Sequence, residues 1–371
     1  MVKRTPPSLK VAIVHDWLLG GGAERVVYEL HKMFPEAPIY TSCTSNEWRQ
    51  KMDGKVTTGW LQHLGRIRKF IPFLRIWWFT HLKFDGYDLV ISSSGAEAKG
   101  IKVPEGTIHI NYCHAPTHYY WSRYDEYMQH PGFGMFDWLA RIGLRLLVSP
   151  LRRWDFKAAQ RPDYLIANSS HIQAEIKKYY HRDAVVIHPP VETERFVTKD
   201  SKKRHGFLAG GRLTPYKRND LVVQACTKLN LPLTVYGDGP DKKRLEAMAG
   251  PSVTFTGFIS DKKVANLFAS SEAFIFPLLD DFGIVSIESL AAGTPVIAYK
   301  AGGAIDYVTP GKTGEFFDTQ TVDSLSDVLE KFDSTKYSAE TIAAAAQKFS
   351  ARKFQERMRM FIDERLGQAH P

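Results

Sequence analysis

The sequence predicts an α/β protein with two domains in tandem, each built on a parallel β-sheet. Its 371 residues are too many for one ordinary hydrophobic core and suit two domains of about 150 to 200 residues. Short apolar runs recur with room for a helix between them, which is typical of β-α units with parallel strands.

Each half of the chain contains five of these runs. Those of the first half are residues 11–14, 89–91, 108–110, 164–167 and 185–187. Those of the second half are residues 207–209, 233–236, 253–255, 273–276 and 296–298. Apolar residues at helical spacing occur in the segments 220–229, 263–269 and 322–329.

A polar, highly charged stretch at residues 197–205 separates the two series. We therefore expect an N-terminal domain over residues 1–199 and a C-terminal domain over 200–345. Helical patterning from Ala339 to Leu366 predicts a final segment, 346–371, that returns as a helix to the first domain.

Composition narrows the class of protein. The chain is 44% hydrophobic and 24% charged, as in folded globular proteins. Cys43, Cys113 and Cys226 stand far apart, which favours neither a disulfide framework nor a thiolate metal site. With no apolar run of membrane-spanning length and no signal-peptide core, we expect a cytoplasmic protein. The net charge of +9 favours an anionic partner: nucleic acid, a membrane surface or a phosphorylated small molecule.

The first glycine-rich turn follows the strand at 11–14. Residues Gly20, Gly21 and Gly22 precede a helical pattern that begins at Ala23. Backbone N–H groups and the helix dipole favour a phosphate at such a turn. A tight connection without a ligand is the alternative. A dehydrogenase is disfavoured, because no G-x-G-x-x-G with an acid about twenty residues later is present.

A pair of cations follows the strand at 207–209. Arg212 and Lys217 flank a turn restricted by Pro215, and together they could hold two phosphates. The alternative is a solvated basic turn.

The next candidate element runs from Phe274 to Glu288. A strand ends at Pro277 and a helix begins near Gly283, whose neighbouring N–H groups could hold a diphosphate. Glu288 lies about eight residues beyond Asp280, one or two turns into that helix, so both carboxylates could be directed at one hydroxyl-rich ligand. A metal site at Asp280 and Asp281 is disfavoured by the lack of a nearby His or Glu cluster. A helix cap with a solvated glutamate is the other alternative.

Several of these motifs occur in an order that resembles the retaining GT-B glycosyltransferases of family 4. They are Gly-Gly-Gly-Ala-Glu-Arg at 20–25, Gly-Arg-Leu at 211–213 with Lys217, Tyr-Gly-Asp-Gly-Pro at 236–240, and the segment 280–295. The resemblance covers nearly the whole chain. The stretches 114–121 and 215–218 further resemble bacterial mannosyltransferases of O-antigen and exopolysaccharide synthesis. The family has two Rossmann-like domains with parallel sheets that face each other across a cleft.

The resemblance implies a role for each motif residue. Arg212 and Lys217 would bind the diphosphate, Glu288 the ribose and Asp280 a sugar hydroxyl. Backbone amides would come from Phe282, Gly283, Ile284 and Val285, while Phe258 would lie beside the base. His114 would sit at the donor sugar, whereas a lone His after a strand is more often a buried hydrogen-bonded residue. Gly21 and Gly22 would approach the phosphates from the opposite domain. The family usually has Glu where this chain has Asp280, so Asp281 is a candidate substitute.

The implied reaction transfers a hexose with retention, through an oxocarbenium-like state, without cofactor or metal. Arg212, Lys217 and the amides near Gly283 would stabilise the departing diphosphate, and a phosphate oxygen would accept the acceptor's proton. The resemblance favours mannose from GDP-mannose and a saccharide or lipid-linked saccharide acceptor. A UDP-sugar donor and a catalytically silent nucleotide-sugar-binding scaffold remain as alternatives.

The segment Trp60–Phe84 combines cations and aromatics without any Asp or Glu. Its cations are Arg66, Arg68, Lys69, Arg75 and Lys83. A helix of this kind could lie on an anionic membrane, with Arg141, Arg145, Arg152 and Arg153 extending the same face. Alternatively it packs on its own domain with its arginines reaching water. Nucleic acid is disfavoured, since no binding module accompanies the charge.

Overall fold

The computed structural model describes residues 9–65, 72–129, 134–196 and 204–369. The chain forms two compact units: residues 1–188 with 355–371, and residues 189–354. The first boundary thus falls before residue 189 rather than near residue 200. The cause is packing: the Val191 N–H donates to the Phe349 carbonyl at 2.9 Å, and Phe196 belongs to the core of the second unit.

The first unit is built on a seven-stranded sheet of order β3-β2-β1-β4-β5-β6-β7. All its neighbouring strands are parallel. Its strands are β1 (Val11–His15), β2 (Ile39–Thr41), β3 (Val56–Thr58), β4 (Leu89–Ser94), β5 (Ile108–Cys113), β6 (Tyr164–Ala167) and β7 (Val185–Val186). Its helices are α1 (Ala23–Met33), α2 (Asn46–Lys51), α3 (Pro72–Thr80), α4 (Tyr124–Gln129), α5 (Asp137–Ala159) and α6 (Ser170–Tyr180).

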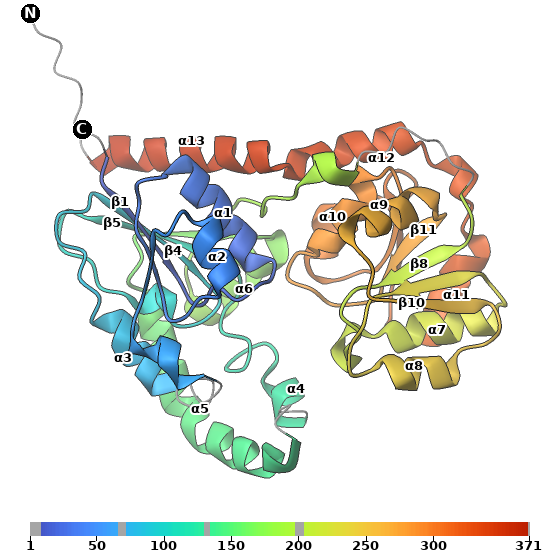
Figure 1. The fold of residues 1–371 in the computed structure, drawn as a ribbon, viewed down its shortest axis with the longest axis horizontal. Helices are drawn as coiled ribbons and strands as arrows, with labels where there is room; N and C mark the ends of the chain where they lie inside the picture. The colour runs from blue at the N-terminus through green and yellow to red at the C-terminus, as the bar shows by residue number, and fades with distance from the viewer. Residues whose placement is uncertain (1–8, 66–71, 130–133, 197–203, 370–371) are drawn as a thin grey trace, which may run out of the picture. The chain divides into compact units, whose positions relative to one another are not determined.

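The second unit holds a six-stranded parallel sheet of order β10-β9-β8-β11-β12-β13. Its strands are β8 (Phe207–Gly210), β9 (Leu233–Tyr236), β10 (Val253–Gly257), β11 (Ala273–Phe276), β12 (Val296–Tyr299) and β13 (Gly314–Phe317). Its helices are α7 (Asn219–Lys228), α8 (Lys242–Met248), α9 (Asp261–Ser270), α10 (Ile284–Ala291), α11 (Val322–Lys331) and α12 (Ala339–Ala346). Figure 1 shows both sheets with helices on their faces, the Rossmann-like arrangement that the sequence predicts.

Alternation along the strands produces a core on each face of the second sheet. On β11, Phe274 and Phe276 belong to one buried cluster, whereas Ala273 and Ile275 belong to another. Successive side chains of a strand point to opposite faces. Apolar burial on both faces explains why these strands read as continuous apolar runs.

The stretch of helical patterning from Ala339 to Leu366 forms two helices rather than one. Helix α12 ends at Ala346, a short 3-10 helix (Gln347–Phe349) follows, and α13 covers Ala351–Ala369. Residues 355–371 are grouped with the first unit. There the Gln355 side-chain amide donates to Glu29 at 2.6 Å.

The segment Trp60–Phe84 is not one exposed helix. Residues 66–71, which include Arg66, Arg68 and Lys69, lie outside the described residues. Arg75 of α3 is buried in an ion pair with Glu97, 2.7 Å away, and Trp78 and Phe79 lie in the core. The expectation that Arg75 belongs to a membrane-facing surface is therefore wrong, because Glu97 holds its guanidinium inside the unit.

A second buried ion pair joins α5 to the rest of the first unit. Lys99 Nζ lies 2.8 Å from Asp155 Oδ1, and both side chains are fully buried. The other Asp155 oxygen accepts hydrogen bonds from Trp121 and Tyr180 at 2.7 Å each. Burial lowers the pKa of Lys99, but the charge and hydrogen bond of Asp155, together with Cys113 and Asp16, more than offset this and raise that pKa above its ordinary value. Among the described residues, no helix combines the length and apolarity that crossing a bilayer requires.

Candidate functional site

The order of the strands marks one edge of each sheet as a place for a ligand. In the second unit the strand order reverses between β8 and β11, and in the first between β1 and β4. Open α/β sheets bind ligands beyond the carboxyl ends of the strands at such a point. Arg212 follows β8 and Asp280 follows β11, so the structure brings these two predicted residues to the same edge.

Glycine turns cover the carboxyl ends of β8, β9 and β10. Gly211 and Gly237 have φ values of 104° and 101°, which side chains rarely adopt. A Cβ on Gly237 would overlap the Gly211 backbone, and the Gly237 N–H donates to the Gly257 carbonyl at 2.8 Å. Backbone therefore packs on backbone along this edge, and few side chains stand between the sheet and a ligand.

The two predicted cations stand above these turns. Arg212 is exposed, and Lys217 is half-buried at the end of the 3-10 helix Pro215–Lys217. Burial lowers the pKa of Lys217, the carboxylate of Asp280 raises it, and the charge of Arg212 lowers it; the net change is downward. The three charges are thus close enough to interact, and the ammonium of Lys217 is only partly neutralised. An added anion would stabilise it.

The turn after β11 is held by backbone contacts. Asp280 accepts the Asp281 N–H at 3.0 Å through its own carboxylate, and the Asp280 carbonyl accepts the Gly303 N–H at 2.9 Å. A Cβ on Gly303 would come within 2.7 Å of the carbonyl oxygens of Asp281 and Phe282. The turn therefore rests directly on the Gly302-Gly303 backbone.

Gly283 begins helix α10 in the left-handed region, with φ 94°. A Cβ there would lie 2.5 Å from the Tyr307 hydroxyl, so only glycine fits. The N–H groups of Gly283, Ile284 and Val285 stand at the N-terminal end of α10, where helices favour anions. The Phe282 side chain, in contrast, is buried against Tyr307 and Phe349.

Glu288 lies in the second turn of α10 and is largely buried. Burial raises the pKa of Tyr236 at the end of β9, and the charge of Glu288 raises it further. Glu288 is therefore near the carboxyl end of β9, on the same edge as the cations.

Phe258, after β10, is 85% exposed and offers an unpacked aromatic face beside Gly257.

The predicted residues of the first unit form a separate group. His114 Nε2 lies 2.7 Å from the Ser93 hydroxyl, and the His15 ring donates from Nδ1 to the Ser93 carbonyl at 2.7 Å. The rings of His15 and His114 meet edge to face at 6.1 Å. His114 is thus partly buried and hydrogen-bonded, directly after β5 and beside the carboxyl ends of β1 and β4.

Gly21 and Gly22 are exposed before α1. Glu24 accepts the Gly20 N–H at 2.9 Å and the Leu19 N–H at 3.3 Å. Two amides of the turn are therefore engaged by a carboxylate.

Three supporting residues were not singled out from the sequence. Gly302 and Gly303 support the turn after β11. The feature of the sequence that could have identified them is a pair of glycines soon after the strand at 296–298. Asp16 accepts the N–H groups of Gly95, Ala96 and Ala98 at 2.7–2.9 Å. Asp16 thereby fixes the turn after β4. No pattern in the neighbouring sequence predicts this role, because the turn lies about eighty residues further along the chain.

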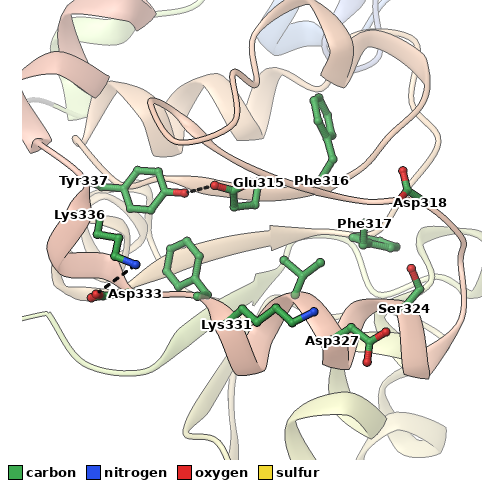
Figure 2. A pocket seen from close by; sticks show the side chains of 12 residues that line it. Glu315, Phe316, Phe317, Asp318, Ser324, Asp327, Lys331, Asp333, Lys336 and Tyr337 are labelled. Atoms are coloured by element: carbon green, nitrogen blue, oxygen red, sulfur yellow. Dashed lines mark hydrogen bonds and ion pairs between the residues drawn. The ribbon is translucent and has the colours of Figure 1, made fainter.

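A pocket of about 460 Å³ lies elsewhere in the second unit, between β13 and α11. Figure 2 shows Tyr337 donating to Glu315 at 2.5 Å and Lys336 paired with Asp333 at 3.9 Å. None of the predicted site residues lines it. Among the described residues, no group of three or more His, Cys, Asp or Glu side chains is placed to hold a metal ion.

Each of the two units matches the model of a known protein family. Residues 20–195 match the model described as Glycosyltransferase Family 4, and residues 190–349 match Glycosyl transferases group 1. The chain belongs to the GT-B glycosyltransferases of family 4. Together the two matches cover every strand of both sheets except β1.

Relatives of this family 4 chain include the GDP-mannose-dependent alpha-mannosyltransferase of Mycobacterium tuberculosis. It is 39% identical over 116 residues, which are 31% of this chain and 30% of the relative. The D-inositol 3-phosphate glycosyltransferase of Streptomyces avermitilis is 30% identical over 221 residues, 50% of this chain and 47% of the relative. The chain thus spans about half or less of these relatives. The solved structure of Anabaena HepE with UDP matches with a TM-score of 0.68 at 17% identity, over 96% of this chain and 100% of that one, and so shows the fold.

Proposed function

We propose that this chain is a retaining glycosyltransferase that holds a nucleotide diphosphate sugar at the carboxyl ends of β8 and β11. The observation that carries the proposal is the grouping of Arg212, Lys217 and Asp280 at that edge. Burial and Arg212 lower the pKa of Lys217, so the free protein contains a cation that lacks full compensation. A diphosphate supplies that compensation.

The phosphates are the part of the donor that this group suits best. A guanidinium and an ammonium on one turn can each donate a charge-assisted hydrogen bond, worth about 1.5–3 kcal/mol. The amides of Gly283, Ile284 and Val285 add backbone donors at the start of α10. When the bond from the anomeric carbon to the phosphate oxygen breaks, its electron pair stays on the diphosphate, and these same groups stabilise the growing charge.

Carboxylates suit the hydroxyl groups of the donor. Glu288 would accept from the ribose near Tyr236, and Asp280 from the sugar. One Asp280 oxygen already accepts the Asp281 N–H, so the sugar would use the other oxygen, or that of Asp281. Phe258 would cover the base.

The acceptor's oxygen attacks the anomeric carbon, and a phosphate oxygen of the leaving diphosphate takes its proton. His114, held by Ser93, would lie at the sugar. We propose no divalent metal for this chemistry, since the cations and amides supply the electrostatic stabilisation. EDTA is therefore expected to leave turnover unchanged.

Mannose from GDP-mannose is the donor we propose, with a saccharide or lipid-linked saccharide as acceptor in cell-surface polysaccharide synthesis. Its support is the similarity to GDP-mannose-dependent mannosyltransferases over about a third of this chain. The stretch from His114 to Trp121 points the same way. A UDP-sugar is the competing donor, and a silent binding scaffold is the competing class.

The test is donor turnover by the full chain, followed by proton NMR with GDP-mannose or UDP-glucose and a panel of octyl glycosides. We expect GDP-mannose to be consumed and the first product to be the α-anomer. Asp280→Asn is expected to lower kcat, and Asp281→Asn to lower it less. If only UDP-glucose is consumed, the donor is a UDP-sugar and not GDP-mannose. A β-anomeric product would refute retention. Nucleotide-sugar binding without turnover would favour the catalytically silent scaffold.

A further inference from the structure

The N-terminal half of helix α5 exposes a row of large apolar side chains. Trp138 is 60% exposed and Leu146 is 71% exposed, and Leu139 and Ile142 between them are exposed as well. Their spacing of three and four residues places them along one side of a helix. Met135, just before the helix, is also exposed. We call residues Met135, Trp138, Leu139, Ile142 and Leu146 the α5 ridge.

The C-terminal half of the same helix is firmly packed. Val148, Leu151 and Asp155 are buried, and Asp155 pairs with Lys99 at 2.8 Å. A Cβ on Gly100 would lie 2.6 Å from the Trp154 ring, so the helix and the residue 98–100 turn are in close contact. In Figure 1 helix α5 runs along the border of the first unit. The ridge is therefore presented by a helix that is fixed at its other end.

Positive charge predominates around the ridge, although Asp137 stands between Met135 and Trp138. From Trp138 to Trp154 there are four arginines and no Asp or Glu. Arg145 and Arg153 are exposed. Arg141 donates to the carbonyls of Met128 and Gln129 at 2.9 Å, and Arg152 lies over the Trp121 and Tyr124 rings.

The exposed apolar side chains and the neighbouring arginines together indicate which kind of partner could cover the ridge. A twofold contact with a second copy would set the same patch against itself, so that its arginines, which outnumber Asp137, would repel one another. An anionic phospholipid interface accepts both features, since acyl chains take the apolar side chains and lipid phosphates pair with arginines. Tryptophan is well suited to that boundary because its ring is apolar and its N–H is polar.

We propose that the α5 ridge docks the first unit on a bilayer containing anionic phospholipid. The docking surface is thus centred on helix α5, which carries the four arginines, whereas the sequence prediction centred it on the segment Trp60–Phe84. The proposal does not rest on the donor site in the second unit, and it would bring the chain to the surface where a lipid-linked acceptor is found.

The test is co-sedimentation of the full chain with two kinds of vesicle: phosphatidylcholine alone, and phosphatidylcholine with phosphatidylglycerol. We expect binding to the anionic vesicles that weakens as salt is added, because salt screens the arginines. Leu146→Glu is expected to weaken this binding by about tenfold or more, since a carboxylate in the interface opposes both insertion and the lipid charge. Arg145→Glu is expected to act in the same direction.

Met360→Glu is the matched control, because Met360 is 72% exposed on another helix of the same unit, α13. We expect it to bind vesicles as the unchanged chain does, and circular dichroism checks that each variant is folded. Equal binding by Leu146→Glu and Met360→Glu would overturn the proposal, as would the absence of vesicle binding. A dimer in light scattering that Leu146→Glu converts to monomer would assign the ridge to a second copy instead.

Discussion

Removing the charge of Lys217 separates a binding role from a structural one. Lys217→Met keeps an unbranched apolar side chain of similar length and deletes the ammonium. In the free protein that ammonium is disfavoured by burial and by Arg212, although Asp280 offsets part of this. The folded protein should therefore lose little or no stability when it is removed, whereas a residue needed for folding would lower the melting temperature.

The cost should instead appear in nucleotide binding. If Lys217 donates one charge-assisted hydrogen bond to a phosphate, its loss is worth about 1.5–3 kcal/mol. The dissociation constant for GDP should then rise by about 10- to 150-fold. Isothermal titration calorimetry of the full chain measures it. Lys228→Met, which removes an exposed lysine of α7 paired with Asp323 at 2.8 Å, should leave GDP affinity unchanged.

The same lysine makes binding depend on pH with a definite sign. Its pKa is lowered in the free protein, and a bound diphosphate favours the charged form and raises that pKa. Affinity should be constant while Lys217 is protonated in the free protein and should fall as the pH rises through its free-state pKa. Lys217→Arg should abolish this fall, because arginine stays charged. Unaltered GDP affinity in Lys217→Met, or an equal alkaline fall in Lys217→Arg, would refute the reasoning.

Two further changes test the supporting structure. Gly303→Ala should displace the turn after β11, because overpacking costs about 1–3 kcal/mol. Calorimetry should then show GDP binding weakened by about tenfold. Gly143→Ala is the control and should bind GDP normally, since nothing lies within 4 Å of the added Cβ. Lys99→Met should leave Asp155 buried without its ammonium and lower the unfolding free energy in urea by about 3–5 kcal/mol. Lys177→Met removes only an exposed pair and should cost at most about 1 kcal/mol, so equal losses in the two lysine variants would contradict the assigned burial.

The central strands could be predicted because each is buried on both faces. Runs such as Val11–Val14 and Ala273–Phe276 are apolar throughout, and every predicted run lies within or over an observed strand. Strands β2 (Ile39–Thr41), β3 (Val56–Thr58) and β13 (Gly314–Phe317) were not predicted, since they are three or four residues long and partly polar. Strand β2 is defined by its pairing with β1 and β3, and β13 by its pairing with β12.

The break between α12 and α13 also lacks a local signal. No Pro or Gly interrupts residues 339–366, and the turn forms where Phe349 enters the core of the second unit and Ser350 becomes extended. Tertiary packing thus overrides helical patterning that is continuous in the sequence.

The candidate site was predictable to the extent that it follows strand ends. Arg212 and Asp280 come directly after strands that prove to be neighbours, and so they share an edge. The contact of Gly303 with the Asp281 carbonyl joins turns that only the folded sheet brings together. The burial of Arg75 by Glu97 likewise depends on tertiary contact, which composition does not reveal.

Nucleotide binding by the intact chain tests the central claim most directly. A thermal-shift series with GDP, GDP-mannose, UDP, UDP-glucose and ADP compares the bases, since a ligand at about a hundred times its dissociation constant stabilises the fold by about 2.7 kcal/mol. We expect the largest rise in melting temperature with GDP and GDP-mannose, and a smaller rise in Lys217→Met. No rise with any of these nucleotides would contradict a donor site at the carboxyl ends of β8 and β11.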